Sequence, residues 1–298
     1  MSLTFNYQIK FDYGISSQES PLIRRIIAHN PSPFTFHGTG TYIVGTKNVA
    51  VIDPGPNIKS HINALLHELK DETVSHILIT HTHIDHSPAA KILQEYTGAK
   101  TYGFGPHKPY DQQACDSVEE GADYDFVPDC KINDGDIIDN KNWSLKAIHT
   151  PGHCSNHISY RLEQEKALFT GDHVMGWSTT VIAPPDGNMN DYLNSLKKIL
   201  HDENNIYWPT HGPSIKNPAK FVKELLKHRE ERELAIVDCI KSGNDTIDKI
   251  VKKIYKNTNK NLHKAAGLSV LAHINRLINT GKIQCEGSPT NHSKFEIT

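Results

Sequence analysis

Short apolar runs and amphipathic stretches alternate along the first part of the chain. Residues 40–45 (GTYIVG) and 49–53 (VAVID) are apolar and rich in β-branched side chains, and the polar turn 46–48 separates them. This pattern predicts a β-hairpin. In the following segment, 58–69, the apolar side chains at 58, 62, 65, 66 and 69 fall on one face of a helix. The chain therefore opens with a sheet and a helix that covers it.

The alternation continues through the middle of the chain. Residues 76–80 (HILIT) predict a buried strand, and 88–96 predict a helix that ends at Gly98. Three further strands are predicted at 143–150 (WSLKAIHT), 157–162 (HISYRL) and 167–172 (ALFTGD), the last two joined by the turn 163–166 (EQEK). His or Asp recurs near the downstream ends of these strands. In α/β folds, binding and catalytic side chains collect on loops beyond strand ends.

The side chains at these strand ends form a candidate metal-binding set. Its members lie beside Gly, Pro or Thr in four stretches, HTHIDH, TPGH, TGDH and PTHG. They are His81, His83, Asp85, His86, His153, Asp172 and His211. Groups spaced as closely as those of HTHIDH would repel or desolvate one another without a cation between them.

The ligand types indicate which metal is bound. Imidazole and carboxylate without thiolate suit zinc, with iron and manganese as alternatives, whereas calcium takes only oxygen ligands. Seven ligands exceed one tetrahedral site, so two ions that share a carboxylate, typically about 3.5–4 Å apart, are predicted. Two such ions would lower the pKa of a shared water to near neutrality, and the bridging hydroxide would attack a carbonyl or phosphorus.

The last third of the chain has a different pattern. Asn217 and Pro218 predict the start of a long charged helix that continues to about residue 240. Two more helices follow, at 246–257 and at 268–281, the first with an apolar face of Ile and Val and with lysines largely elsewhere. A final hairpin, 282–298, completes a helix–helix–wing arrangement. The lysines are Lys249, Lys252, Lys253 and Lys256.

Composition and charge narrow the class of protein. The 298 residues, 37% of them hydrophobic, can bury a full core, but no apolar run approaches the roughly 18 residues of a membrane span. The first residues lack the apolar stretch of a signal peptide. Five cysteines, at 115, 130, 154, 239 and 285, form no CxxC pair. These features predict a cytoplasmic enzyme in a reducing compartment that does not bind a membrane.

Charge is distributed unevenly between the two parts of the chain. After residue 216, 15 Lys and Arg stand against 9 Asp and Glu, an excess of +6. The preceding residues hold 17 against 25, a balance of −8. A basic tail on an acidic body is compatible with a polyanionic partner, and equally with solvated helix faces.

The order of HTHIDH, TPGH, TGD and THG resembles that of the metallo-β-lactamase fold superfamily, over roughly residues 34–216. This resemblance implies an α/β fold, the αβ/βα four-layer sandwich, as a catalytic domain at 1–216, with 217–298 forming a helix and a winged-helix domain. It also implies that His81, His83 and His153 hold one metal, that Asp85, His86 and His211 hold the other, and that Asp172 bridges them. Asp53, in VIDPG, would orient a metal-binding histidine or cap its Pro-Gly turn.

Two longer stretches, 30–45 and 178–196, resemble the β-lactamase-like protein 2 subgroup. Its animal members are endoribonucleases that cut single-stranded RNA, and they carry a winged helix. Gly40 departs from the asparagine of the family's GTNTY run. In the pattern of the best-known subclass of zinc β-lactamases, a cysteine stands at the position that resembles Asp172. Lactam hydrolysis is therefore not expected as the main role. Neither the glutathione-binding segment of glyoxalase II nor the β-CASP insertion is found.

Three functions follow as hypotheses. The favoured one is a binuclear zinc endoribonuclease for single-stranded RNA, in which Asp85 orients the nucleophile. The second is a thioester or ester hydrolase similar to hydroxyacylglutathione hydrolases, and the third is a metal-containing RNA-binding or docking protein without catalysis. A winged helix also allows a homodimer. Substrate contacts are assigned to Ser178, Thr179 and Thr180 and to the four lysines.

Four other side chains receive structural interpretations. Cys154 could be a reactive thiol or an additional ligand, but a small buried residue in the wall of the site is the favoured interpretation. His157 could support a metal ligand, although its place at the start of a strand fits an ordinary polar strand end. Tyr255 and Phe295 could stack on bases, but core or surface positions are the favoured interpretation.

Overall fold

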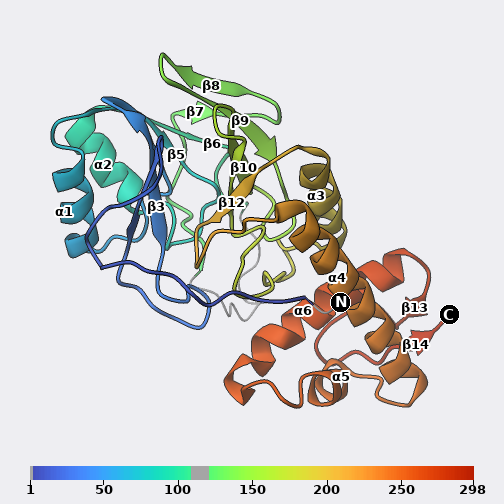
Figure 1. Cartoon of the computed structure of the whole chain (residues 1–298). Coiled ribbons are helices and arrows are strands. Elements are labelled where there is room, and N and C mark those ends of the chain that lie inside the picture. The colour runs from blue at the N-terminus through green and yellow to red at the C-terminus, as the bar shows by residue number, and fades with distance from the viewer. Residues whose placement is uncertain (1–2, 109–120) are drawn as a thin grey trace.

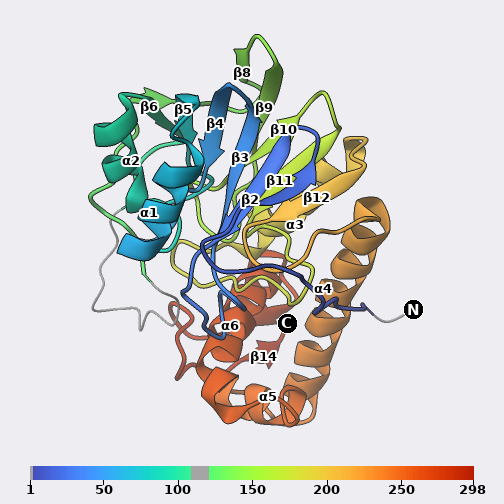
Figure 2. The same cartoon turned by 60° about the vertical axis from the view of Figure 1, so that its left-hand side comes forward.

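The structure is a computed structural model that describes residues 3–108 and 121–298. Within these residues two sheets face each other (Figures 1 and 2). The first sheet has its strands in chain order, β1 (Ser17–Ser20), β2 (Ile23–Ile27), β3 (Gly40–Thr46), β4 (Asn48–Ile52), β5 (Thr73–Leu78), β6 (Lys100–Gly103) and β7 (Cys130–Lys131). The second has the order β12-β11-β10-β9-β8. Its strands are β8 (Ile137–Asn140), β9 (Trp143–His149), β10 (Ile158–Leu162), β11 (Ala167–Gly171) and β12 (Ile206–Pro209).

Helices cover the outer face of each sheet, while the inner faces pack together around Tyr42, Trp143 and Phe169. The helices α1 (Lys59–Glu68) and α2 (Ala89–Thr97) lie on the first sheet, and α3 (Met189–His201) lies on the second. Apolar helix residues recur at helical spacing and are buried against the sheets, which removes their surface from water. The predicted four-layer αβ/βα sandwich is therefore confirmed.

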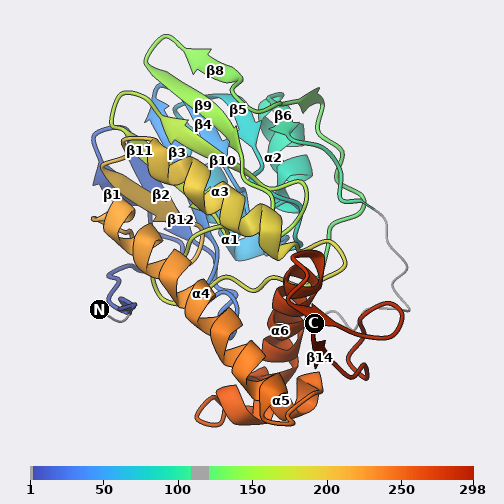
Figure 3. The ribbon, with the colours of Figure 1, turned by 90° about the vertical axis from the view of Figure 1, so that its right-hand side faces the viewer.

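Helix α4 (Pro218–Lys241) joins the sandwich to the C-terminal helices, as Figure 3 shows. Phe221 and Leu225, near its start, pack with the sandwich, whereas Ile236 and Ile240, near its end, belong to a separate apolar core. That core also contains the buried Phe295, as predicted. Its elements are α5 (Ile247–Ile254), the short 3-10 helix η2 (Lys260–Leu262), α6 (His263–Asn279), β13 (Ile283–Gln284) and β14 (Glu296–Ile297). The predicted helix–helix–wing arrangement is present, with very short strands in the wing.

Most of the predicted elements form at or within a few residues of the expected positions. Lys47, with φ of 62°, makes the tight turn between β3 and β4, and Gly98 ends α2 with φ of 71°. Asn217 is the residue before the first turn of α4, but its side chain makes no capping hydrogen bond. The predicted strand 76–80 begins earlier, at Thr73, and ends at Leu78.

Strands β1 and β2 were not predicted, because charged residues interrupt their apolar pattern. Arg24 bonds to Glu68 and Glu72, and the buried Arg25 pairs with Glu19 at 2.9 Å. Partners from other segments thus allow two arginines inside a strand that local periodicity does not reveal.

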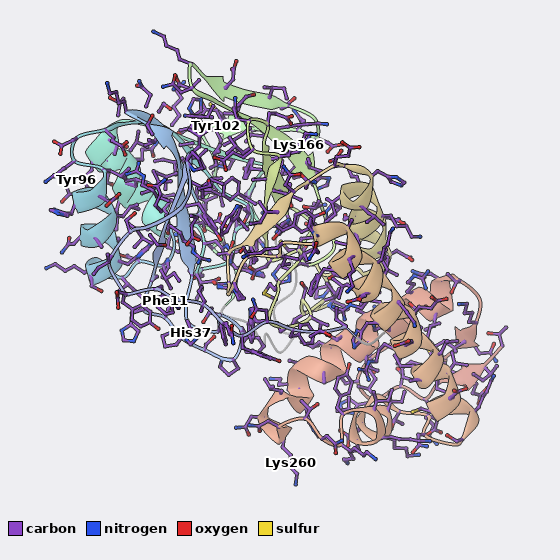
Figure 4. All side chains as sticks on the ribbon, in the orientation of Figure 1. Phe11, His37, Tyr96, Tyr102, Lys166 and Lys260 are labelled. Atoms are coloured by element: carbon purple, nitrogen blue, oxygen red, sulfur yellow. The ribbon has the colours of Figure 1, made fainter. Side chains whose placement is uncertain are left out.

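Three further features concern the surface and the thiols. Phe11 and His37 lie together at the lower edge of the sandwich (Figure 4), their ring centroids 5.3 Å apart, so the N-terminal segment packs on the loop before β3. Cys130, Cys239 and Cys285 are free thiols, Cys154 is buried, and Cys115 lies outside the described residues. Within 3–108 and 121–298, no helix is both long and apolar enough to cross a membrane.

Candidate metal centre and its cavity

The seven candidate ligands come from separate turns at one edge of the two sheets. His81 to His86 follow β5, and His153 follows β9. Asp172 follows β11 directly, and His211 follows β12. Parallel pairing of β4 with β5 and of β11 with β12 brings strand ends to a common edge. Three groups have ligand atoms within 4.8 Å of one another: His81–His83–His153, His81–His86–Asp172 and Asp85–His86–His211.

One half of the centre consists of imidazoles alone. His83 Nδ1 lies 3.0 Å from His81 Nε2 and 3.2 Å from His153 Nε2. Burial lowers the pKa of His81 and of His83 well below the ordinary value, and the neighbouring imidazoles lower each of them further. These rings are therefore neutral at neutral pH and present lone pairs to the centre.

The other half combines imidazoles with carboxylates. His211 Nε2 lies 3.1 Å from Asp85 Oδ2 and 3.3 Å from Asp172 Oδ2, and the corresponding distances from His86 Nε2 are 3.3 and 3.6 Å. Burial lowers the pKa of His211, but the two carboxylates outweigh it and raise the value to about 10. The pKa of His86 is raised well above its usual value for the same reason.

The hydrogen bonds on the far side of the rings test whether this set fits a cation. His153 Nδ1 lies 2.8 Å from the carbonyl of Val181, and His211 Nδ1 lies 3.1 Å from that of Gly38. Since a carbonyl only accepts, each Nδ1 carries a proton, and each Nε2 is the nitrogen that faces the centre. Asp172 Oδ1 is buried without a hydrogen-bond partner among the described residues. Imidazole nitrogens that converge beside carboxylates, one of whose oxygens accepts no hydrogen bond, fit divalent cations.

Asp53 supports the half of the centre that contains both imidazoles and carboxylates, from the side away from the cavity. Its carboxylate accepts from His86 Nδ1 at 2.9 Å, from Thr210 Oγ1 at 3.1 Å, and from the Thr80 backbone N–H and hydroxyl at 2.8 and 2.7 Å. The Thr80 hydroxyl oxygen can then accept from His81 Nδ1, 3.1 Å away. Asp53 itself has φ of 48°, a conformation that Asp and Asn tolerate better than most residues. One carboxylate thus orients ligands on both β5 and β12.

His157 has a supporting role that its sequence position did not indicate. It is fully buried, its Nε2 accepts the backbone N–H of Asp172 at 3.2 Å, and its Nδ1 lies 2.9 Å from the Thr150 hydroxyl. The interpretation of His157 as an ordinary polar strand end is therefore wrong. Cys154 is buried, as predicted. The signal missed in the sequence is the Thr beside the ligand turns, at 80, 150 and 210.

A cavity of about 300 Å³ opens onto the ligands His83, Asp85, His153, Asp172 and His211. Ser178, Thr179 and Thr180, assigned to substrate from the sequence, line it. Apolar side chains form much of the same wall, among them Phe34, Met175, Trp177 and Val181. The ring of Trp177 stacks on Phe36 at 4.9 Å, which joins the loop before β3 to the loop after β11.

The C-terminal helices supply the opposite wall. Arg229 and Arg232 reach the cavity from α4, Tyr255 from the end of α5, and Ala266 and Ser269 from α6. The guanidinium of Arg232 lies 4.5 Å from the centroid of the Tyr255 ring, a cation–π contact. Tyr255 is therefore a cavity residue, not only a core or surface one.

The four lysines assigned to substrate lie elsewhere on α5 and just after it, and none of them lines this cavity. Lys249 bonds to Asp245 at 2.7 Å, Lys252 to Asp248 at 2.8 Å, and Lys253 to the Ser242 hydroxyl at 2.8 Å. Lys256 is exposed. Their assignment to a substrate stays a prediction for a ligand that extends beyond the cavity.

Comparison with known proteins is consistent with this geometry. Residues 35–211 match the metallo-beta-lactamase superfamily, and residues 246–291 match the beta-lactamase-associated winged helix domain. A beta-lactamase-like protein 2 homolog of Caenorhabditis elegans is 31% identical over 89% of this chain and 87% of the relative. The atrochrysone carboxyl ACP thioesterase AgnL7 of Paecilomyces divaricatus is 30% identical over 76% of this chain and 67% of the relative.

A solved structure shares the whole architecture. The beta-lactamase domain protein from Burkholderia ambifaria aligns over 99% of this chain and 97% of its own, with a TM-score of 0.80 and 17% identity. Members of the matched superfamily are typically metal-dependent hydrolases, and the His and Asp clusters provide this chain with the corresponding ligands. The chain therefore belongs to the metallo-beta-lactamase superfamily, as a hydrolase of this fold with the associated winged helix domain, and its relatives include the beta-lactamase-like protein 2 homologs.

Proposed function

We propose that the chain is a binuclear zinc hydrolase that cleaves a small thioester or ester held in the cavity. The single observation that carries this proposal is the cavity itself, in which metal ligands form one end and largely apolar side chains form the walls. Its volume of about 300 Å³ suits an acyl chain, since ligand sites are typically apolar with a few placed polar groups. Bound zinc would supply an activated water and polarise the carbonyl of the substrate.

The residues of the chain have distinct roles in this proposal. His81, His83 and His153 would hold one ion, Asp85, His86 and His211 would hold the other, and Asp172 would serve both. Asp85 would also orient the attacking water, and the Thr39 hydroxyl, which donates to its Oδ2 at 3.3 Å, fixes the carboxylate. Ser178 and Thr179, both partly exposed on the cavity wall, offer hydroxyls to the substrate.

The comparisons support an acyl substrate without deciding it. One relative is named an atrochrysone carboxyl ACP thioesterase, and its identity of 30% is close to the 31% of the beta-lactamase-like protein 2 homolog, over a smaller share of both chains. A carrier-bound thioester would place its scissile carbonyl at the metals and its carrier protein outside the cavity.

Cleavage of single-stranded RNA is the second candidate. The observation that favours it is the pair of Arg232 and Tyr255 on the wall, since aromatic rings stack on bases and guanidinium groups bind phosphate. In that case the exposed lysines of α5 would contact the strand beyond the cavity.

A substrate panel with the zinc-loaded protein separates the two candidates. It compares acyl thioesters of increasing chain length, S-lactoylglutathione, labelled single-stranded RNA, a generic phosphodiester and a chromogenic lactam. We expect kcat/KM above roughly 10⁴ M⁻¹ s⁻¹, the enzymatic range, for a thioester and poor hydrolysis of the lactam. RNA as the preferred substrate would replace the first candidate by the second, and efficient lactam hydrolysis would contradict both.

A further inference from the structure

Arg229, in the middle of α4, is a buried cation that pairs with no carboxylate of the described residues. Its side chain is 3% exposed. Nη2 donates to the carbonyl of Thr180 at 2.6 Å, while Nε is buried with no hydrogen-bond partner. Among the described residues, no carboxylate lies within ion-pair distance of this guanidinium. Burying a charge without pairing it is costly, so the position calls for a compensating group.

The surroundings of Arg229 do not supply that group. Glu233, one turn further along α4, is engaged by Arg276 at 2.6 Å and by His273 at 3.4 Å. Tyr192 contributes only a ring face, 5.1 Å from the guanidinium carbon. Burial, assisted by the charge of Arg229, lowers the pKa of His228 and of His273 to about 4, so both rings are neutral at neutral pH and carry no charge that could compensate the guanidinium.

The same side chain lines the cavity of the metal ligands. Its partner Thr180 donates its hydroxyl proton to the carbonyl of Asp172 at 2.8 Å. The next residue, Val181, accepts from His153 Nδ1 at 2.8 Å. Consecutive Cα atoms are about 3.8 Å apart, so adjacent carbonyls of one segment hold Arg229 and a metal ligand. The guanidinium is therefore fixed relative to the metal centre.

We propose that Arg229 is a specificity residue that binds an oxyanion of the substrate, at the end of the acyl chain remote from the scissile bond. The proposal rests on the proposed function, since it makes the substrate a thioester or ester of a dicarboxylic acid. Among the described contacts, Nη1 of the guanidinium has no hydrogen-bond acceptor, and the N–H groups of a guanidinium bind carboxylates well. A phosphate group offers the same chemistry and is the other source of the oxyanion.

The test measures binding, so it needs no turnover. Isothermal titration calorimetry of the zinc-loaded protein compares glutarate with glutaramate, which differ only by a carboxylate in place of an amide. Both keep one carboxylate for the metals. We expect the wild type to bind glutarate about 30-fold or more tightly than glutaramate, the usual loss when one partner of a buried charge pair is removed. Equal affinities in the wild type would overturn the proposal.

Variants of Arg229 assign the preference to this side chain. Arg229→Met should bind both compounds about equally, and Arg229→Lys should keep part of the preference because it keeps the charge. The matched control is Arg161→Met, which removes an arginine of β10 that pairs with Glu163 and does not line the cavity, and it should retain the full preference. Retention of the preference in Arg229→Met would contradict the proposal. If that variant does not fold, the wild-type comparison and Arg229→Lys still decide.

A third compound distinguishes the two sources of the oxyanion. 4-Phosphonobutyrate replaces one carboxylate of glutarate by a phosphonate. Tighter binding of glutarate supports a dicarboxylic acyl chain, and tighter binding of the phosphonate supports a phosphorylated substrate; both need Arg229. The substrate panel tests the proposed function separately from the role of Arg229. A protein that cleaves no thioester can still show the Arg229-dependent preference for glutarate.

Discussion

The two walls of the cavity are built differently. On the sandwich side, His81, His86, His153 and His211 are buried, and carbonyls, the Thr80 hydroxyl or the Asp53 carboxylate hold their outer nitrogens. On the helical side, Arg232 and Tyr255 are partly exposed and make a cation–π contact with each other. Arg229 is the exception, because it is buried on that wall and bonded to the sandwich.

This difference assigns metal binding to the sandwich wall and substrate selection to the helical wall. Strand ends of a rigid sheet can hold ligand atoms within tenths of an ångström, which metal binding requires. A helical unit attached to that sheet can change its side chains without disturbing the ligands. α4 packs on both cores and so keeps the second wall in register with the first.

The largest effect is expected when the shared carboxylate of the sandwich wall is removed. Asp172→Ala should lower kcat/KM by about 10³-fold or more and reduce the zinc content from about two ions per chain to about one. Elemental analysis and steady-state kinetics measure both. Asp139→Ala, on the exposed edge strand β8, is the control and should leave both unchanged. Near wild-type turnover of Asp172→Ala would show that the bridging assignment is wrong.

A smaller effect on the same wall is expected from Asp53→Asn. The substitution keeps a side chain that tolerates the φ of 48° but replaces an oxygen that accepts hydrogen bonds by an amide that donates them. Zinc affinity should fall about 10- to 100-fold, the usual loss for a group that orients a ligand. Competition with a chelator measures it. Unchanged affinity would mean that the four hydrogen bonds of Asp53 are not needed to orient His86.

The helical wall can be destabilised by acid without touching a metal ligand. Burial lowers the pKa of His273 to about 4, against about 6.5 in an unfolded chain. Between these values the unfolded state binds a proton that the folded state does not, so stability falls as the pH falls from about 6.5 to about 4. The loss is about 1.4 kcal/mol per pH unit, or tenfold in the folding constant.

His273→Gln should remove that contribution, and denaturant midpoints measured across this pH range should then depend less on pH. His67→Gln, at an exposed position of α1, is the control. A pH dependence in His273→Gln equal to that of the wild type would assign the acid sensitivity to other groups.

The smallest effect is expected from the lysines outside both walls. Replacing Lys249, Lys252, Lys253 and Lys256 by Gln should leave kcat/KM for a small substrate within about twofold, since screened surface ion pairs contribute little. If RNA is the substrate, its affinity should fall steeply with salt in the wild type and less steeply in the variant, by about 0.7 in the slope for each lost phosphate contact. Identical salt slopes would remove these lysines from the RNA path and leave the winged helix as a docking or dimerisation element.

The sequence by itself indicated most of the central elements and predicted the ligand set. The 3.6-residue spacing of apolar residues in α1 and the β-branched runs of β3 and β4 are local signals, and the structure has the corresponding elements. The order HTHIDH, TPGH, TGD and THG predicted which side chains are metal ligands, because groups spaced as closely as those of HTHIDH would repel or desolvate one another without a cation.

Only the tertiary structure decided how these residues combine. The bonds from Asp53 to Thr80 and Thr210, the support of Asp172 by His157, and the contact of Arg229 with Thr180 join segments whose relative positions depend on strand register and helix packing. The same holds for β2, whose arginines are tolerated only because distant glutamates meet them. The second wall of the cavity comes from residues that begin almost twenty positions after the last metal ligand. Periodicity along the chain encodes which face of an element is buried, but it does not encode which distant side chain that face will contact.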